Sequence, residues 1–560
     1  MSGASARLSR PPERLMAASR TPVRVLILGG GFGGVYTAVH LEKLLKREIA
    51  AGEVELSLVS REDYMVFQPM LPEVISGSIG IVETITPIRR MCPRTSLYTR
   101  VIEKIDVEKK RVWAGAGFGA RGCDLGFDHL VIALGNVTSF AGQPGLAEHA
   151  LPFKYLGDAL NLRNRIIHTL EEADIETDPA IRRALLTFVV AGGGFSGVEA
   201  VAELNDFVSR VAKNFRSLKR QEMRVVLLHA GGLILPELPK SLAEFAQRLL
   251  ARRGVELRLN TRLAGATAEG ALLDNGERIP TRTLVSTVPS APNPLVTTLP
   301  CKMERGRIVV NGHLEVPDRP GVWAIGDCAW IRDAKTGEQC PPTAQHAIRE
   351  ARCAAENIAA SIRGGTKKTF SFQALGKLGS LGHRSAVAEV LGVKVSGFLA
   401  WFLWRTIYLM KLPGLDRKLR VATDWTLDLI LPPDIVQLKT EKSIGIRREH
   451  FEPGEIIVRE GDRGDWLYII ADGEVEVVRR VEDGHQILGC LGRGECFGEI
   501  ALISDTPRTA TVRSKTGVNV LAVDRDAFHT LFASLPPLRG FFEQLIEERV
   551  GGAPTPGADR

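Results

Sequence analysis

An acid and an arginine stand close together in the stretch FGEIALISDTPRTATV, residues 497–512. Glu499 can accept a hydrogen bond from a hydroxyl group, and Arg508 offers a planar fork of N–H donors to a phosphate. Small residues around them leave backbone N–H groups accessible to anionic oxygens. The stretch therefore predicts a pocket for a ligand that carries both a hydroxyl group and a phosphate. The candidate pocket residues are Gly498, Glu499, Ile500, Ala501, Arg508, Thr509 and Ala510.

Two glycine-rich loops occur in the first half of the chain. Each has the spacing Gly-x-Gly-x-x-Gly, follows an apolar strand pattern (VRVLIL or LTFVVA) and precedes an apolar-periodic helix. Such glycines let the backbone approach a pyrophosphate, whose charge the N-terminus of the helix stabilises. We therefore predict two α/β dinucleotide-binding units, although two glycine turns without ligands would show the same spacing. The six glycines are Gly29, Gly31, Gly34, Gly192, Gly194 and Gly197.

Two further strand patterns end in residues that suit the same chemistry. FDHLVIALG ends in a tight turn at Ala133 and Gly135, and GVWAIGDCA puts Gly326 and Asp327 at the end of an apolar strand. A carboxylate at that edge of a doubly wound sheet can hold a hydroxyl group of a ribityl or phosphate-linked chain. The alternative for Asp327 is a helix N-cap.

Chain length and amino-acid composition indicate what kind of protein must position these residues. A chain of 560 residues is too long for one hydrophobic core, and 44% hydrophobic with 24% charged residues is typical of a soluble globular protein. The eight cysteines form no C-x-x-C pair, which argues against a zinc ribbon or a disulfide framework and fits a reducing cytoplasm. We predict no metal site and no nucleic-acid partner. Residues 1–21 lack the apolar core of a signal peptide and are predicted to be a disordered arm.

Residues 384–420 combine an excess of lysine and arginine with aromatic residues. Trp401, Trp404 and Tyr408 interleave with apolar residues, and Arg405 interrupts the run, which makes it too polar to span a bilayer. Tryptophan and tyrosine favour the membrane interface, and basic residues favour anionic headgroups. We predict a peripheral anchor on an anionic membrane surface. A core helix or a homodimer interface is the alternative.

Six motifs make residues 22–438 resemble the type II NADH dehydrogenases. They are GGGFGG, FQPMLPEVISG, GGGFSGVEAVAEL, AIGDCA, PPTAQHA and GKLGSLGHRSAV. The resemblance implies FAD on the first dinucleotide unit and NADH on the second, with hydride passing to FAD and electrons passing on to a membrane quinone. It also implies a peripheral protein on the cytoplasmic face of the plasma membrane. A non-catalytic nucleotide sensor built on the same scaffold is an alternative from another class.

The resemblance assigns cofactor contacts residue by residue, with two departures from the family pattern. Glu62 is the nearest acid after a strand that ends at Ser60, where the family usually has the acid itself. His229 stands where the family usually has glutamate, so a 2′-phosphate is not repelled and NADPH stays open beside NADH. The implied FAD contacts are Gly29, Gly31, Gly34, Glu62, Ala133, Gly135, Gly326, Asp327, Ala344 and Gln345, and the implied NADH contacts are Gly192, Gly194, Gly197, Glu199 and His229.

The same resemblance implies two catalytic residues, Glu199 and Gln345. Gln345 belongs to AQHAIRE, which keeps the first glutamine of the family's A-Q-x-A-x-Q-Q pattern but has Arg349 in place of a later one. Arg349 is therefore a weaker candidate for a quinone contact. Cys340 lies just before this stretch and keeps open a sulfide:quinone oxidoreductase, which would use a cysteine relay on the same scaffold.

The pattern changes after Leu438 to short alternating strands with glycine turns, which predicts an antiparallel roll. Residues 445–549 resemble cyclic-nucleotide-binding domains. This resemblance implies that Glu499 holds the ribose 2′-hydroxyl and Arg508 the cyclic phosphate. Thr509 matches a cGMP-selective pattern, but cAMP, or a degenerate roll without a ligand, stays open. The segment LPPLRGFFEQLIEERV would form a helix that covers the base.

We therefore predict an α/β flavoprotein with two Rossmann-like domains, a membrane-associating helical segment and a C-terminal all-β jelly roll with flanking helices. Nucleotide binding to the roll would then regulate the enzyme. The predicted boundaries are 1–21 for the arm, 22–140 and 289–375 for the FAD domain, 141–288 for the NADH domain, 376–438 for the membrane and quinone segment, 439–549 for the cyclic-nucleotide domain and 550–560 for a tail.

Overall fold

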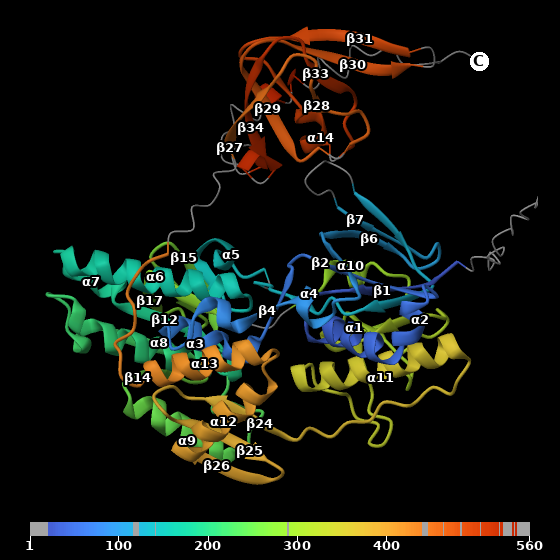
Figure 1. The fold of residues 1–560 in the computed structure, drawn as a ribbon. Coiled ribbons are helices and arrows are strands. Elements are labelled where there is room, and N and C mark those ends of the chain that lie inside the picture. The colour runs from blue at the N-terminus through green and yellow to red at the C-terminus, as the bar shows by residue number, and fades with distance from the viewer. Residues whose placement is uncertain are drawn as a thin grey trace, which may run out of the picture. The chain divides into compact units, whose positions relative to one another are not determined.

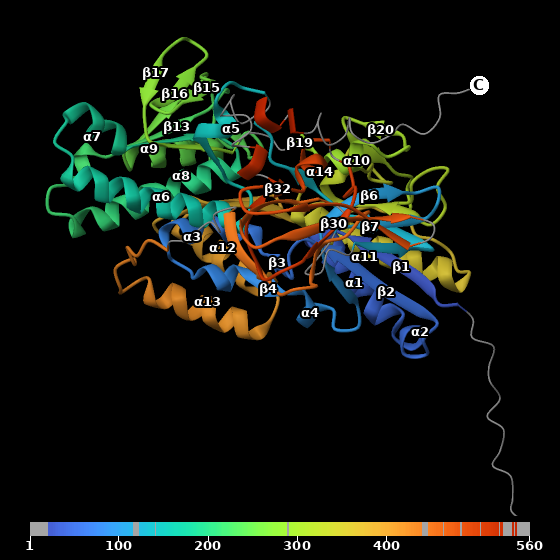
Figure 2. The same ribbon diagram turned by 90° about the horizontal axis from the view of Figure 1, so that it is seen from above.

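The chain forms two compact units in the computed structural model (Figures 1 and 2). The first unit is residues 1–114 with 124–437, and the second unit is residues 438–560 with 115–123. The predicted tail, all but the last residue of the predicted arm, and most of the predicted C-terminal helix lie outside the described residues. The structure describes residues 21–115, 122–140, 142–287, 291–438, 446–462, 464–481, 484–504, 506–525, 527–529, 540–542 and 544–545.

A five-stranded parallel sheet carries the first glycine loop near its centre. Its strands run in the order β5-β2-β1-β9-β22. The loop joins β1 to α1 (Phe32–Leu44), which packs against α11 (Ala344–Arg363) (Figure 1). The central strands are apolar because both faces of a parallel sheet are covered. The strands are β1 (Val23–Leu28), β2 (Val54–Ser60), β5 (Ser96–Thr99), β9 (His129–Ile132) and β22 (Val322–Ala324).

A second parallel sheet repeats this arrangement around the second glycine loop. Its order is β14-β13-β12-β18-β11, so the strand that feeds the loop again lies in the middle. The loop joins β12 to α8 (Phe195–Val211), and α6 (Leu156–Ile175) contacts β11 and β18. The prediction of two Rossmann-like units is confirmed. The strands are β11 (Ala150–Pro152), β12 (Thr187–Ala191), β13 (Arg224–Leu228), β14 (Val255–Arg258) and β18 (Thr283–Ser286).

A three-stranded antiparallel sheet and two helices follow. Helix α12 (Phe398–Lys411) packs on the sheet β24 (Gly376–Ser380), β25 (Ala386–Val390) and β26 (Val393–Gly397), and α13 (Leu415–Leu427) packs beside α12. Trp404 is 1% exposed and contacts the rings of Trp425 and Tyr408. The prediction that Trp404 faces a membrane interface is therefore wrong, because α13 covers it. No helix in the described part of the chain is long and apolar enough to cross a bilayer.

The second unit is the predicted antiparallel roll. Its two four-stranded sheets have the orders β27-β34-β29-β32 and β28-β33-β30-β31, and their inner faces share an apolar core that includes Ile470, Val475 and Val520. A short helix, α14 (Glu499–Ile503), follows β32. The strands are β27 (Ile446–Phe451), β28 (Ile456–Val458), β29 (Trp466–Asp472), β30 (Val475–Val481), β31 (Gly484–Leu491), β32 (Cys496–Phe497), β33 (Thr511–Ser514) and β34 (Val518–Asp524).

Shorter elements connect these layers. Helix α3 (Leu71–Ser76) packs against α6 and α8. The others are α2 (Lys46–Ala50), β3 (Tyr64–Val66), β4 (Ile85–Pro87), α4 (Ile88–Met91), β6 (Ile102–Asp106), β7 (Arg111–Ala114), β8 (Cys123–Gly126), β10 (Asn136–Val137), α5 (Leu146–His149), α7 (Pro179–Leu185), α9 (Lys240–Arg252), β15 (Leu263–Thr267), β16 (Gly270–Leu273), β17 (Arg278–Pro280), β19 (Ala291–Pro292), α10 (Pro294–Thr297), β20 (Met303–Glu304), β21 (Arg307–Val309) and β23 (Ala329–Trp330).

Candidate functional site

The first glycine loop is open at Gly31, where a pyrophosphate could lie, and tightly packed at Gly34. A Cβ atom at Gly34 would stand 1.9 Å from the carbonyl oxygen of Gly29, so this glycine is required for helix α1 to approach β1. A Cβ at Gly31 would meet no atom within 4 Å. The open side of Gly31 lies at the N-terminus of α1, where backbone N–H groups and the helix dipole favour an anion.

The second loop has the same geometry. A Cβ at Gly197 would stand 1.9 Å from the carbonyl oxygen of Gly192, whereas a Cβ at Gly194 would meet only a Glu237 oxygen at 3.6 Å. The ring of His229, just after β13, lies against the loop, because a Cβ at Gly193 would come within 2.4 Å of its Cγ. His229 Nε2 is 3.0 Å from the carbonyl oxygen of Leu233. The three loop glycines and His229, four of the five predicted NADH contacts, therefore lie at one end of the second sheet.

The acid after β2 is not among the side chains nearest to the glycines of the first loop. Glu62 is exposed, and its backbone N–H donates to Ser60 Oγ at 3.3 Å. Ser60 itself reaches the loop, since a Cβ at Gly30 would stand 2.2 Å from Ser60 Oγ. The side chain next to the loop is thus Ser60, which ends β2 two residues before the predicted Glu62.

Asp327 lies in a short turn that directly follows β22, at Gly326–Cys328. The N-cap of this turn is Ile325, so the alternative of Asp327 as a helix N-cap is not what the structure shows. Burial raises the pKa of Asp327, and the nearby Lys154 ammonium lowers it in part. The Gly326 N–H donates to Glu350 Oε2 at 2.7 Å. Lys154 and Glu350 are polar neighbours that the sequence motifs do not reveal.

Glu199 and Gln345, the two predicted catalytic residues, are joined by one strand. Gln345 Nε2, at the start of α11, donates to the carbonyl oxygen of Gly376 at 3.0 Å. Glu199 Oε1, on α8, accepts from the backbone N–H of Ser380 at 2.9 Å. Gly376 and Ser380 are the first and last residues of β24. One side chain from each Rossmann-like unit is thus hydrogen-bonded to β24, Gln345 at its first residue and Glu199 at its last.

Burial raises the pKa of Glu199 to about 8. The Ser380 N–H lowers it in part, and the negative charges of Glu203 and Glu73 add to the increase. The phenol of Tyr408, on α12, is buried near this carboxyl, and burial raises its pKa as well. Glu199 therefore keeps its proton at neutral pH, and its neutral carboxyl can donate that proton.

A buried acidic cluster continues from Glu199 along α8. Glu203 and Asp206 follow at helical spacings of four and three residues, which put them on the same face of α8. Glu73 of α3 joins them, and burial raises the pKa of Glu73 and of Asp206 to about 7. A cavity of about 480 Å³ is lined by Glu73, Glu203 and Asp206 and by residues 428–433. These acids were not predicted, because their neighbours come from three separate segments.

Two of the seven cationic side chains predicted to meet a membrane, Arg405 and Arg417, are engaged inside the protein. Arg405 lies 3.5 Å from Glu73 Oε1 and over the rings of Trp401 and Trp425. Arg417 is nearly buried, with Nη1 4.0 Å from Glu83. Arg384, Lys394, Lys411 and Arg420 are exposed, and so is a set of large apolar side chains in the same region. These apolar side chains are Phe398, Leu399, Phe402, Met410, Leu415 and Leu419.

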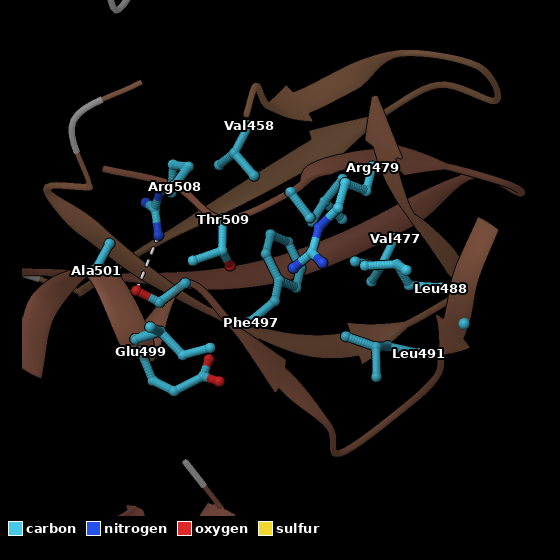
Figure 3. Close-up of a pocket in the computed structure, with 15 residues that line it drawn as sticks. Val458, Val477, Arg479, Leu488, Leu491, Phe497, Glu499, Ala501, Arg508 and Thr509 are labelled. Atoms are coloured by element: carbon cyan, nitrogen blue, oxygen red, sulfur yellow. Dashed lines mark hydrogen bonds between the residues drawn. The ribbon is translucent and has the colours of Figure 1, made fainter. Parts of the chain in front are cut away.

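The second unit holds a cavity of about 280 Å³ that collects the residues of the FGE and PRTA motifs (Figure 3). Glu499 is buried at the start of α14. Arg508 donates to the carbonyl oxygens of Gly498 at 2.8 Å and Trp466 at 2.6 Å, and burial lowers the pKa of its guanidinium. Gly498 has φ +92°, and a Cβ there would lie 2.2 Å from Arg508 Nη1, which explains the glycine before the acid. All seven predicted pocket residues line this cavity.

Comparison with known proteins assigns the parts. Residues 23–351 match the pyridine nucleotide-disulphide oxidoreductase family, residues 375–431 the NDH2 C-terminal domain and residues 448–534 the cyclic nucleotide-binding domain. The type II NADH:quinone oxidoreductase NdhA of Mycobacterium tuberculosis is 30% identical over 430 residues, 73% of this chain and 87% of that protein. The chain belongs to the type II NADH:quinone oxidoreductases.

The chain is also similar to a second curated protein and shares its fold with a solved structure. The demethylphylloquinone reductase NdbB of Synechocystis is 31% identical over 409 residues, 72% of this chain and 95% of that protein. The structure of NDH2 from Plasmodium falciparum in complex with RYL-552 has a TM-score of 0.68 at 18% identity, and covers 74% of this chain and 100% of that one.

The cysteine that kept the sulfide:quinone alternative open is a poor nucleophile. Burial raises the pKa of Cys340 to about 12, so the thiol is protonated at neutral pH. None of the eight cysteines forms a disulfide. Cys328, in the turn that holds Asp327, is also buried, and its pKa is raised to about 11.

Proposed function

We propose that the first unit oxidises NADH and reduces a quinone, with FAD held at the first glycine loop. The observation that carries this proposal is the pair of hydrogen bonds that fixes Glu199 and Gln345 to the two ends of β24. When bound, FAD would supply the chemistry that accepts hydride and passes on two electrons. The chain's own residues bind, orient and supply protons.

Each group has a role that its geometry suits. The open side of Gly31 and the N-terminus of α1 would bind the pyrophosphate of FAD, and Asp327 would hold a hydroxyl of its ribityl chain. Gly194 would do the same for the pyrophosphate of NADH. Glu199, protonated on its carboxyl, would donate a proton to the reduced quinone oxygen. Gln345 Oε1 is buried with no hydrogen-bond partner among the described residues and would accept from a bound donor.

Steady-state turnover tests the proposal. The purified chain should be yellow, and it should oxidise NADH with a soluble quinone as acceptor. Cys340→Ser should keep this activity and should gain none with sulfide as donor, because no thiol takes part. A folded protein that takes up no FAD, or one that turns over only sulfide, would contradict the proposal.

The apolar surface of α12 and α13 is proposed to rest on a membrane. Its exposed side chains lie on the same segment as β24, so a quinone that leaves the lipid would enter close to Glu199 and Gln345. Apolar burial in the interface would provide the larger part of the affinity, since Arg405 and Arg417 are engaged internally. The exposed cations Arg384, Lys394, Lys411 and Arg420 would add an attraction to anionic headgroups. The predicted cytoplasmic face is part of this proposal because NADH is supplied there.

The second unit is proposed to bind a cyclic nucleotide and to regulate the first. Glu499 would accept from a ribose hydroxyl, and Arg508 would hold the cyclic phosphate. Arg508→Ala should abolish most of the affinity for any cyclic nucleotide in calorimetry of the full chain. Glu499→Ala should cost less, because it contacts a neutral hydroxyl. Equal affinities for the wild-type chain and Arg508→Ala would argue against this site.

A further inference from the structure

Arg479 is a second cation in the cavity of the second unit. It lies on β30, and Figure 3 shows its guanidinium directed into the cavity, apart from Arg508. Its side chain is only half-buried and makes no hydrogen bond or ion pair with any residue in the described ranges. No sequence motif singled out Arg479. A charged group that lines a pocket without a protein partner is available to a ligand.

The surroundings of Arg479 are those of a base rather than of a phosphate. Figure 3 places Val477, Leu488 and Leu491 on its side of the cavity, away from Glu499 and Arg508. Apolar walls with one convergent polar group are typical of a site for a flat heteroaromatic ring. If Arg508 takes the cyclic phosphate and Glu499 the ribose, the base points toward Arg479.

The chemistry of an arginine discriminates between the two purines. Guanine presents two acceptors side by side, O6 and N7, which a guanidinium can bind with two parallel hydrogen bonds. Adenine presents the N6 amino donor beside N7, so one N–H of the arginine would face another donor. We propose that Arg479 reads the base and makes the second unit selective for cyclic GMP. This inference rests on the proposed cyclic-nucleotide site and goes beyond it by naming the ligand and the residue that selects it.

Three nucleotides and one matched variant test the role of Arg479. Cyclic IMP keeps O6 and N7 but lacks the amino group of guanine, so it isolates the acceptor pair. Calorimetry of the full chain should show that cyclic GMP and cyclic IMP bind more tightly than cyclic AMP. Arg479→Ala should weaken both by roughly 5- to 150-fold, the range for one bidentate base contact, and should change the affinity for cyclic AMP by less than about twofold.

Arg480→Ala is the control. Arg480 is the next residue on β30, points to the opposite face of the strand and is exposed. The Arg480→Ala protein should bind all three nucleotides with the affinities of the wild type. The same protein samples should keep their NADH turnover, which shows that the chain is folded.

Each contrary outcome has a distinct meaning. If Arg479→Ala weakens all three nucleotides equally, the arginine attracts the phosphate and the inference is wrong. A wild type that prefers cyclic AMP, or shows no base preference, overturns the inference but leaves the proposed site standing. If the wild type binds none of the three, the proposed site and the inference fail together.

Discussion

A side chain at Gly31 would meet open space, and a side chain at Gly34 would meet the carbonyl oxygen of Gly29. The two glycines of one motif are therefore required for different reasons. One keeps a ligand's place free, and the other allows the helix to pack on the strand.

This difference predicts two distinct failures. Gly31→Val should fold, with the same urea midpoint as the FAD-free wild type, but should bind no FAD because the side chain occupies the pyrophosphate's space. Gly34→Val should lower the urea midpoint of the FAD-free protein itself, since α1 cannot approach β1. Visible flavin absorbance and urea titrations measure both. Flavin uptake by Gly31→Val would contradict the assignment of the loop.

The raised pKa of Glu199 predicts how stability changes with pH. The folded pKa is about 8 and the ordinary value is 4.5, so the folded state binds the proton more tightly than the unfolded state. The contribution of this group is therefore present below pH 4.5 and is lost as pH rises to 8, with a slope of up to about 1.4 kcal/mol per pH unit. Glu199→Gln removes this group's share of the slope and leaves that of Glu73 and Asp206. The variant should therefore gain stability relative to the wild type as pH rises from roughly 5 to roughly 9.

Urea unfolding of both proteins across this range is the measurement, and Glu244→Gln, a partly exposed residue on α9, is the control. Quinone turnover at saturating NADH should also fall in the wild type as pH passes about 8, because the proton donor ionises. Parallel stability curves for Glu199→Gln and the wild type would contradict the raised pKa.

At the scale of elements, the sequence predicted those features that depend on neighbouring residues and missed those that depend on tertiary contacts. The strand, glycine turn and helix at Gly29 and Gly192 are set by neighbouring residues, and both were predicted correctly. The burial of Trp404 was not, because it depends on α13, whose contact with α12 is tertiary. The acids Glu73 and Glu203 were missed for the same reason, since each is ordinary within its own motif. Arg479 could be found only from the register of β30 in the roll.

Helix α12 exposes two phenylalanines, Phe398 and Phe402, that are proposed to contact the membrane. Replacing Phe398 and Phe402 by serine should reduce binding to lipid vesicles by more than tenfold, because each buried aromatic contributes roughly 1.5–3 kcal/mol. Salt should weaken binding less than these two replacements do, because salt screens the attraction of the exposed cations but not the apolar contacts. Co-sedimentation with vesicles measures it, with Ile175→Ser, an exposed apolar residue on α6, as the control. Loss of binding in high salt, with the Phe variants unaffected, would favour a basic anchor instead.

At the scale of the whole molecule, the two units can affect each other only through different affinities in two states of the chain. A coupling of about 1–3 kcal/mol would change NADH or quinone affinity by roughly 5- to 150-fold when nucleotide binds. The same factor must then appear as a change in nucleotide affinity when an NADH analogue fills the first unit. Calorimetry in both directions measures it. Equal affinities in both directions, with turnover insensitive to nucleotide, would mean that the second unit does not regulate the first.

Strand β24 is hydrogen-bonded to both predicted catalytic side chains of the first unit. Its first residue holds Gln345, its last residue holds Glu199, and its chain continues through β25 and β26 into α12. Five residues of extended backbone span only about 13 Å between their first and last Cα atoms, so one end cannot shift without pulling the other. If a lipid surface displaced α12, β24 would move with it. Glu199, the proposed proton donor, and Gln345 would then shift together.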